Sequence, residues 1–304
     1  MSAGWVGGSV RGRLLARHRL GPDGARALAA TSSLDAACAE LGGSVYADAV
    51  ADAVTVDAVQ HALLASALWD LRVLAGWVPA RGVETLRVFA AWFEIRNLEH
   101  LLLDGRVDPP AFEMGTLATA WTRVREARSP LDVRDALRRS AWRDPGSDDA
   151  TAMLVSMRLE WAQWISGIGG SGRYWGSSAA ALVVARSIAE HPEPLDAAVT
   201  RRAAFLGRRV ADVSSFPALV AALPETCRWV FEGIEDPRDL WRAEARWWGR
   251  LERDGTGLLR APRPGPAVVL GAVAVILADA WRTTAALEIA SRGGRGQEVI
   301  DATA

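Results

Sequence analysis

The stretch that decides the fold is Ser32-Ser33-Leu34-Asp35-Ala36-Ala37-Cys38-Ala39-Glu40-Leu41-Gly42-Gly43-Ser44-Val45-Tyr46. Within it, Leu41 lies eight residues after Ser33, and Ser44 lies three residues after Leu41. The same spacing returns twice, as Ser129, Leu137 and Ser140 and as Ser215, Leu223 and Thr226. Because a fixed spacing that recurs along a chain indicates an internal repeat, the sequence predicts one unit of roughly 90 residues that occurs three times.

Each copy carries the residues of a helix start. Ser129 is followed by Pro130 and Asp132, a pattern in which serine caps the helix, proline takes the first helical position and the acid lies in the first turn. Ser33 and Ser215 are expected to begin helices in the same way, with the leucine two turns later facing the core. We interpret these serines as structural rather than catalytic.

Composition excludes several classes of function. The chain has 304 residues, of which 50% are hydrophobic and 23% charged, and its formal net charge is −1. This is enough for a large core in a soluble protein, and the near-neutral balance gives no reason to expect nucleic acid as a partner. All basic residues are arginines, so neither a Schiff-base lysine nor a phosphate-loop lysine is present.

Cysteine and histidine are too sparse for a disulfide framework or a metal site. The two cysteines indicate a reducing compartment, and the four histidines show no metal-ligand spacing. These residues are Cys38, Cys227, His18, His61, His100 and His191. We expect no catalytic residues, no metal and no cofactor.

Neither a secretory signal nor a membrane span is expected. The first ten residues contain no apolar run. The most apolar run, Ala267 to Ala278, is well short of the roughly 20 residues needed to span a bilayer. It is interpreted as a buried core helix.

Apolar residues recur every three or four positions, and strand-favouring residues are few, which predicts an all-α fold. We expect three similar helical units, residues 1–105, 106–195 and 196–304. Expected breaks between helices are Gly21 to Gly24 and the glycines at 76, 167 and 255. The expected helices are 11–18, 25–30, 56–74, 84–103, 114–127, 152–165, 177–189, 198–213, 238–250 and 266–291.

Two features resemble functional motifs. Gly167 to Gly172 matches the G-x-G-x-x-G fingerprint, but a helix rather than a strand is expected before it, so a helix–helix turn is the better interpretation. Glu94, Arg96, Asn97 and Glu99 form the densest polar cluster on an apolar helix. Asn97 falls on the core stripe, where an inter-helix hydrogen bond is expected rather than a binding role.

Arginines gather in the first helix of each unit. One interpretation is a set of solvated faces, and the other is three basic surfaces brought together to receive an acidic partner. The candidate partner-binding residues are Arg11, Arg13, Arg17, Arg123, Arg125, Arg201, Arg208 and Arg209.

The combination resembles the family of the socket-like C-type subunits of prokaryotic V/A-type ATPases, whose eukaryotic counterpart is the d-type subunit of the vacuolar ATPase. The resemblance rests on the three helical units, Leu14-Leu15 in an arginine-rich helix, the segment Leu41 to Tyr46, the helix Phe93 to Leu98 and the stretch 266–300. That family favours Leu-x-x-Thr-x-Tyr, where Ser44 replaces the threonine here. It also favours an acid three residues before Asn-Leu, which Glu94, Asn97 and Leu98 match. The chain departs from the family at Arg282, where asparagine is expected, and in 181–189, where the polar pattern is lost, so it resembles a divergent member.

The resemblance implies a funnel of three helical domains with pseudo-threefold symmetry. It also implies a non-catalytic central-stalk component, peripheral on the cytoplasmic face of the membrane. Such a component is a socket that couples the rotor shaft to the membrane proteolipid ring during proton or sodium transport, without a small-molecule substrate.

Two other interpretations of the residues are open. A free-standing α-helical repeat scaffold that binds a protein partner would share the composition and the repeat. An α-helical enzyme is disfavoured, because the sequence contains no clustered set of acidic residues, histidines or cysteines.

Overall fold

The computed structural model describes residues 3–104, 109–190, 197–294, 296 and 298–301, and the regular structure of these residues is helical throughout. The all-α prediction is therefore confirmed. The chain divides into two compact units: unit 1 is Met1–Leu86, Val107–Gly115 and Trp248–Ala304, and unit 2 is Arg87–Arg106 and Thr116–Trp247. The predicted repeat boundaries, at residues 105/106 and 195/196, fall outside the described residues.

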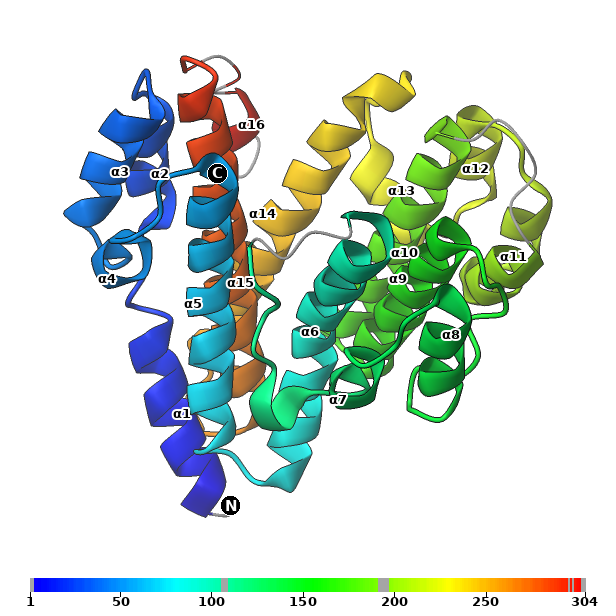
Figure 1. Cartoon of the computed structure of the whole chain (residues 1–304), viewed down its shortest axis with the longest axis horizontal. Coiled ribbons are helices and arrows are strands. Elements are labelled where there is room, and N and C mark those ends of the chain that lie inside the picture. Colours follow the sequence, from blue (N-terminus) through cyan, green and yellow to red (C-terminus); the bar gives the residue numbers. More distant parts are fainter. Residues whose placement is uncertain (1–2, 105–108, 191–196, 295, 297, 302–304) are drawn as a thin grey trace. The chain divides into compact units, whose positions relative to one another are not determined.

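Unit 1 is built on one long helix, α15 (Pro266–Ser291). Helix α5 (Val56–Ala75) runs beside α15, and α1, α2 and α3 also pack on it (Figure 1). The remaining elements of the unit are α1 (Ala3–Leu15), α2 (Gly21–Ala29), α3 (Leu34–Gly42), α4 (Ala47–Val50), α16 (Glu298–Asp301), the start of α6 (Ala80–Glu99) and the end of α14 (Leu240–Leu259).

Helix α15 is the expected buried core helix. Among the described helices it alone is long and apolar enough to cross a membrane by length and composition, yet 78% of its most apolar window is buried inside the protein. Its polar residues Asp279, Arg282 and Thr283 are buried as well. The side chains of Asp279 and Arg282 bind groups that belong to unit 1.

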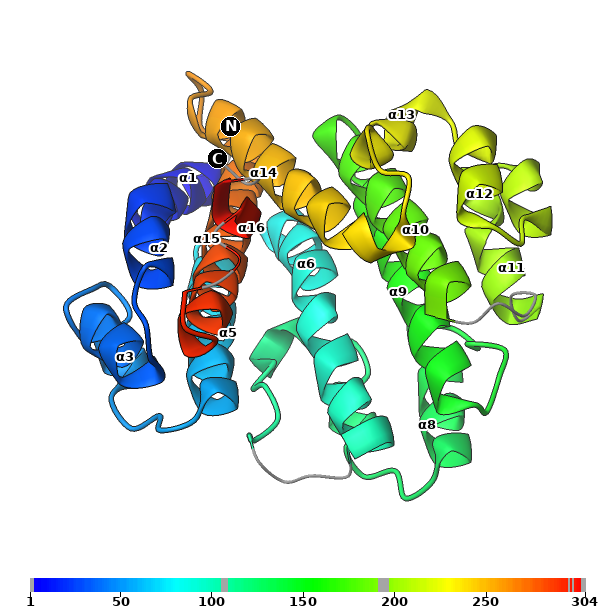
Figure 2. The ribbon, with the colours of Figure 1, turned by 90° about the horizontal axis from the view of Figure 1, so that it is seen from above.

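Unit 2 is organised around a helical hairpin. Helices α9 (Ala150–Gly167) and α10 (Ser171–Glu190) pack along their whole length, and the views of Figures 1 and 2 both show them side by side. Helix α11 (Ala197–Ala203) packs on α9, while α12 (Phe216–Ala222) and α13 (Glu225–Arg228) pack on α10. The unit also contains α7 (Trp121–Val124), α8 (Pro130–Arg138), most of α6 with its π-helical end η1 (His100–Asp104), and the 3₁₀ turns η2 (Gly115–Leu117), η3 (Ala204–Leu206), η4 (Arg208–Asp212), η5 (Trp229–Phe231) and η6 (Pro237–Asp239).

The three predicted helix starts are confirmed. The hydroxyls of Ser33, Ser129 and Ser215 accept hydrogen bonds from the backbone N–H three residues on, and each serine has extended backbone before its helix. The leucines eight residues later are all buried: Leu41, Leu137 and Leu223. Local capping chemistry therefore recurs in the structure with the spacing seen in the sequence.

Other helix bounds differ from the predictions, because glycine and proline can start, interrupt or lie inside a helix, depending on their position. Helix α2 begins at the expected break, Gly21, since Pro22 suits the first turn of a helix. Gly255 lies inside α14 rather than at a turn; a Cβ there would lie 2.8 Å from that of Ala274, so this glycine permits close packing on α15. The expected helix 198–213 is divided at Gly207, whose φ is 125°.

The segment expected as the helix 114–127 is also divided. It contains only η2 and the four-residue α7, because the backbone between them turns its N–H groups at Thr119 and Ala120 onto the buried carboxylate of Glu94.

Close contact within the α9–α10 hairpin depends on Gly176. A Cβ at this position would lie 2.3 Å from both Ala162 O and Ser166 N, which are backbone atoms of α9. We expect Gly176→Ala to force the helices apart and to lower the free energy of unfolding by about 3 kcal/mol. Urea denaturation followed by circular dichroism measures this loss.

Gly257→Ala is the matched control. Gly257 is an exposed helical position in α14 with no atom within 4 Å of the added Cβ, so its substitution should raise stability by up to about 1 kcal/mol through helix propensity. Equal effects of the two substitutions would contradict the packing role of Gly176.

Candidate partner-binding surface and buried carboxylates

A buried carboxylate on α15 holds the start of α2 in unit 1. Asp279 is 1% exposed. One of its oxygens accepts hydrogen bonds from Leu20 N and from the Tyr46 hydroxyl, both at 2.9 Å, and the other accepts from Gly21 N at 2.8 Å. Burial, and then the neighbouring Asp279, raise the pKa of Tyr46 well above its usual value, so Tyr46 remains a hydrogen-bond donor.

The same arrangement recurs in unit 2, around Glu94 on α6. One oxygen of Glu94 accepts from Ala120 N and from Trp142 Nε1, and the other accepts from Thr119 N, all at 2.7 Å. The two amides precede α7, as those of Leu20 and Gly21 precede or open α2. Burial raises the pKa of Glu94, although the hydrogen bonds from Thr119 N, Trp142 Nε1 and Ala120 N oppose this effect.

The two carboxylate clusters share a sequence spacing. Tyr46 lies thirteen residues after the N-cap Ser33, and Trp142 lies thirteen residues after the N-cap Ser129. In both copies the residue two positions before the aromatic is a serine, whose hydroxyl donates to the buried leucine carbonyl and accepts from the aromatic residue's N–H: Ser44 and Ser140. Each carboxylate therefore fixes the same short segment onto a long core helix.

The third copy differs. The only acidic residue of α10 is Glu190, at its exposed end, and the residue thirteen positions after Ser215 is Arg228, whose guanidinium donates to Leu223 O. The loss of the polar pattern in 181–189 thus corresponds to a helix that is buried mainly through apolar and small residues along this stretch, with Val184 and Ala185 0% exposed.

The densest polar cluster of the sequence is mainly structural. Glu94 and Asn97 are 0% and 2% exposed, as the core-stripe position of Asn97 predicted. Glu99, on the same helix, pairs with Arg96 at 3.0 Å and with Arg158 on α9. Glu94, which belongs to the motif behind the resemblance, therefore has a structural role: it accepts hydrogen bonds inside unit 2.

The candidate arginines of unit 1 have three different environments. Arg13 donates from Nε to Leu259 O at 3.1 Å and from a terminal nitrogen to Ala261 O at 2.7 Å, which fixes it at the end of α14. Arg11 lies close enough to Asp70 to lower its pKa. Arg17 is exposed.

The candidate arginines of unit 2 lie at two locations. Arg123 and Arg125 lie on and next to α7; the others lie on α11 and η4. The full set, all exposed, is Arg123, Arg125, Arg201, Arg208 and Arg209.

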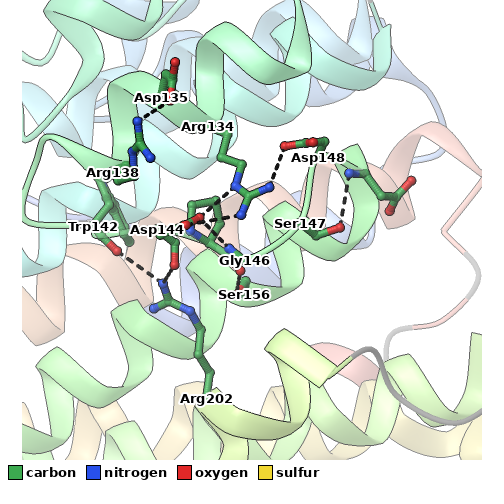
Figure 3. Close-up of polar contacts among 12 residues, drawn as sticks. Arg134, Asp135, Arg138, Trp142, Asp144, Gly146, Ser147, Asp148, Ser156 and Arg202 are labelled. Carbon is green, nitrogen blue, oxygen red and sulfur yellow. Dashed lines mark hydrogen bonds and ion pairs between the residues drawn. The ribbon is translucent and has the colours of Figure 1, made fainter.

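Two further arginines bind the polar loop between α8 and α9. Figure 3 shows Arg134 paired with Asp144 and Asp148, each at 2.8 Å, and Arg202 donating to the carbonyls of Trp142 and Asp144. Arg202 also pairs with Glu160 on α9. Hydrogen bonds from Arg134, and then from Gly146 N, lower the pKa of Asp144 to about 2. The carboxylates of Asp144 and Asp148 therefore both form ion pairs with Arg134.

The glycine-rich segment 167–172 is a helix–helix turn, as expected. It joins α9 to α10, and Gly169 and Gly170 have φ values of 78° and 54°. These left-handed conformations favour glycine and explain the composition of the segment without a bound nucleotide.

Asp70 on α5 has a shifted pKa that the sequence did not indicate. Burial raises its pKa to about 6, although His18 and Arg11 lower it. Because this pKa exceeds the usual 3.8, the folded state loses stability as the pH rises through the interval from about 4 to 6 and does not regain it at higher pH.

Asp70→Asn should therefore raise the melting temperature at pH 7.5 and leave it nearly unchanged at pH 4. Thermal unfolding followed at both pH values measures the difference. Asp52→Asn, at an exposed turn residue, serves as the control, and an increase of the same size at both pH values for Asp70→Asn would show that Asp70 is not the titrating group.

Comparisons with protein-family models and with curated proteins find no match.

Proposed function

We propose that this chain is a non-catalytic central-stalk component of a rotary V/A-type ATPase, a socket that couples the rotor shaft to the membrane proteolipid ring. The observation that carries the proposal is the pair of carboxylate clusters at Glu94 and Asp279. The residues of the family-like motif, Glu94, Asn97 and Leu98, are buried, and Glu94 binds the backbone before α7, which in the proposed arrangement belongs to the next repeat.

The Asp279 cluster holds together residues of unit 1, and the Glu94 cluster holds together residues of unit 2. In the proposed funnel, three such repeats surround a pseudo-threefold axis, and Asp279 of the last repeat holds the start of the first. Such a link between the last and first repeats is expected of a closed arrangement and not of an open solenoid, in which each repeat contacts only its neighbours.

The exposed arginines are the proposed contacts with acidic surfaces of the shaft or ring. The exposed members of the predicted set for which the described residues show no ion pair with a carboxylate are Arg17, Arg123, Arg125, Arg201, Arg208 and Arg209. Arg13 is assigned a structural role instead, since both of its described hydrogen bonds go to carbonyls of unit 1.

The test is affinity capture of the tagged protein from its native membranes, with bound proteins identified by mass spectrometry. We expect recovery of the ring proteolipid and the shaft proteins, lost at high salt because exposed charges are screened. The double variant Arg208→Glu/Arg209→Glu should reduce recovery, while Arg238→Glu, an exposed arginine paired with Asp236, should not.

Recovery of neither ring nor shaft, with the protein abundant in the soluble fraction, would contradict the proposal. A free-standing helical scaffold for another protein would then be the better account. The hydrogen bonds from Leu20 N and Gly21 N to Asp279, which in the proposed arrangement join the last repeat to the first, disfavour this alternative.

A further inference from the structure

Helix α1 buries mainly small residues and exposes three of its four large aliphatic residues. Gly8, Ser9, Gly12 and Leu15 are its buried residues, whereas Val6, Val10 and Leu14 are 43%, 53% and 52% exposed. An ordinary surface helix buries its largest apolar side chains and exposes its small or polar ones.

Close packing holds α1 in this orientation. A Cβ at Gly8 would lie 2.5 Å from Val78, and one at Gly12 would lie 3.0 Å from the Cβ of Ala272 on α15. The Ser9 hydroxyl accepts a hydrogen bond from Gly265 N at 2.9 Å. Rotation of α1 to bury its valines would break these contacts, so the aliphatic row is fixed on the outside.

The exposed row has the dimensions of a helix-packing seam. Val6, Val10 and Leu14 recur every four residues and extend over about 12 Å of helix. Ala3, three residues before Val6, and Arg17, three after Leu14, are also exposed. Spacings of three and four place Ala3, Val6, Val10 and Leu14 on one face of α1, as in the ridge that one helix inserts into the groove of another, and Arg17 follows in the turn after the helix.

The charged residues of the segment that carries the row have one sign, although Asp70 on α5 lies near Arg11. The first 22 residues contain four arginines and no acidic residue. Arg19 is neutralised by Glu252, but Arg17 is exposed beside Leu14, and Arg13 is held by carbonyls rather than by a carboxylate. A helix bound to this face would therefore have better electrostatic complementarity if carboxylates flanked its own apolar row.

We propose that the outer face of α1 receives an acidic amphipathic helix of a partner protein. Three aliphatic side chains in a single row match the groove of one helix. A bilayer-bound helix instead requires a broad apolar face rich in Trp, Phe or Leu, whereas this row is narrow, with one Leu and two Val, and the exposed Trp77 lies beside it at Gly7. The inference deepens the proposed function and rests on it, because it assigns to the socket one contact surface and the chemistry of the element bound there.

The test uses photo-crosslinking in the native host. A benzoylphenylalanine replaces Val10 in the full chain, and in a control it replaces Val54, an apolar residue that is 84% exposed elsewhere in unit 1. Crosslinked peptides are identified by mass spectrometry. We expect position 10 to label a helix with apolar residues every three or four positions flanked by Asp or Glu, at a yield at least about tenfold above that of position 54.

A second variant tests the charge. Arg17→Glu should lower the crosslinking yield at position 10 at least about fivefold, whereas Arg238→Glu should leave it unchanged. Labelling of lipid, of a second copy of this chain, or of the same products from positions 10 and 54 would overturn the inference, as would the absence of any product specific to position 10.

The inference and the proposed function fail separately. Capture of shaft and ring proteins without a crosslink at position 10 would overturn the inference alone. A crosslink to an acidic helix of some other protein, without shaft or ring, would overturn the proposed function and retain the inference.

Discussion

Glu94→Ala should lower the free energy of unfolding by about 3–5 kcal/mol, because it leaves three buried donors without an acceptor. The donors are Thr119 N, Ala120 N and Trp142 Nε1, each 2.7 Å from the carboxylate. Glu94→Gln should cost somewhat less, since an amide oxygen can still accept hydrogen bonds, but its NH₂ group would face an N–H donor. Chemical denaturation gives the free energies.

Hydrogen exchange should show where the stability is lost. In Glu94→Ala, the amides of Thr119 and Ala120 should lose protection, while those of Leu20 and Gly21 should keep it. Asp279→Ala should produce the reverse pattern, because Asp279 binds the amides of Leu20 and Gly21.

Glu84→Ala is the control for Glu94, since Glu84 is an exposed acid on the same helix. It should change stability by less than about 0.5 kcal/mol. If Glu94→Ala were no more destabilising than Glu84→Ala, the carboxylate would not hold the start of α7, and the structural basis for the proposed arrangement would be lost.

Local sequence signals predicted the parts of this fold that depend on local chemistry. A serine followed by proline and an acid specifies a helix start whatever lies around it, and the caps at Ser33, Ser129 and Ser215 are all present. The core position of Asn97 also follows from helical periodicity alone. The resemblance to the ATPase family drew on the same local features.

Local sequence signals do not predict contacts between segments that are distant in the sequence. Glu94 was recognised as part of a polar cluster, but its partner Trp142 is 48 residues away, and Tyr46 is 233 residues from Asp279. The repeat contained a usable signal, because an aromatic donor stands thirteen residues after two of the three cap serines. The prediction of a helix break at Gly255 was wrong for the same reason, because whether a glycine ends a helix or permits close packing depends on the facing helix.

Arg282 is the clearest example of a residue whose environment could not be predicted from local sequence. In sequence it is a departure from the family pattern on the most apolar helix of the chain. In the structure its side chain is 1% exposed and pairs with Glu252 on α14, which also pairs with Arg19 at 2.5 Å. The arginine at this position is therefore accommodated by a buried carboxylate from another helix.

Arg282→Met should lower the free energy of unfolding by about 3–5 kcal/mol, because removal of one partner leaves the other charge buried with less compensation. The double variant Arg282→Met/Glu252→Leu should recover most of this loss, since apolar residues of similar volume often replace a buried ion pair at little cost. Urea denaturation of the two single variants and the double variant gives the coupling energy.

The expected recovery depends on Arg19, the second partner of Glu252. Its side chain is 30% exposed, so water can solvate its charge once Glu252 is removed, and the double variant leaves no fully buried charge at this pair. Arg292→Met, an arginine with a 72% exposed side chain at the end of α15, should cost less than about 1 kcal/mol. If the double variant were as unstable as Arg282→Met, the cost would come from packing around the arginine rather than from the unpaired Glu252.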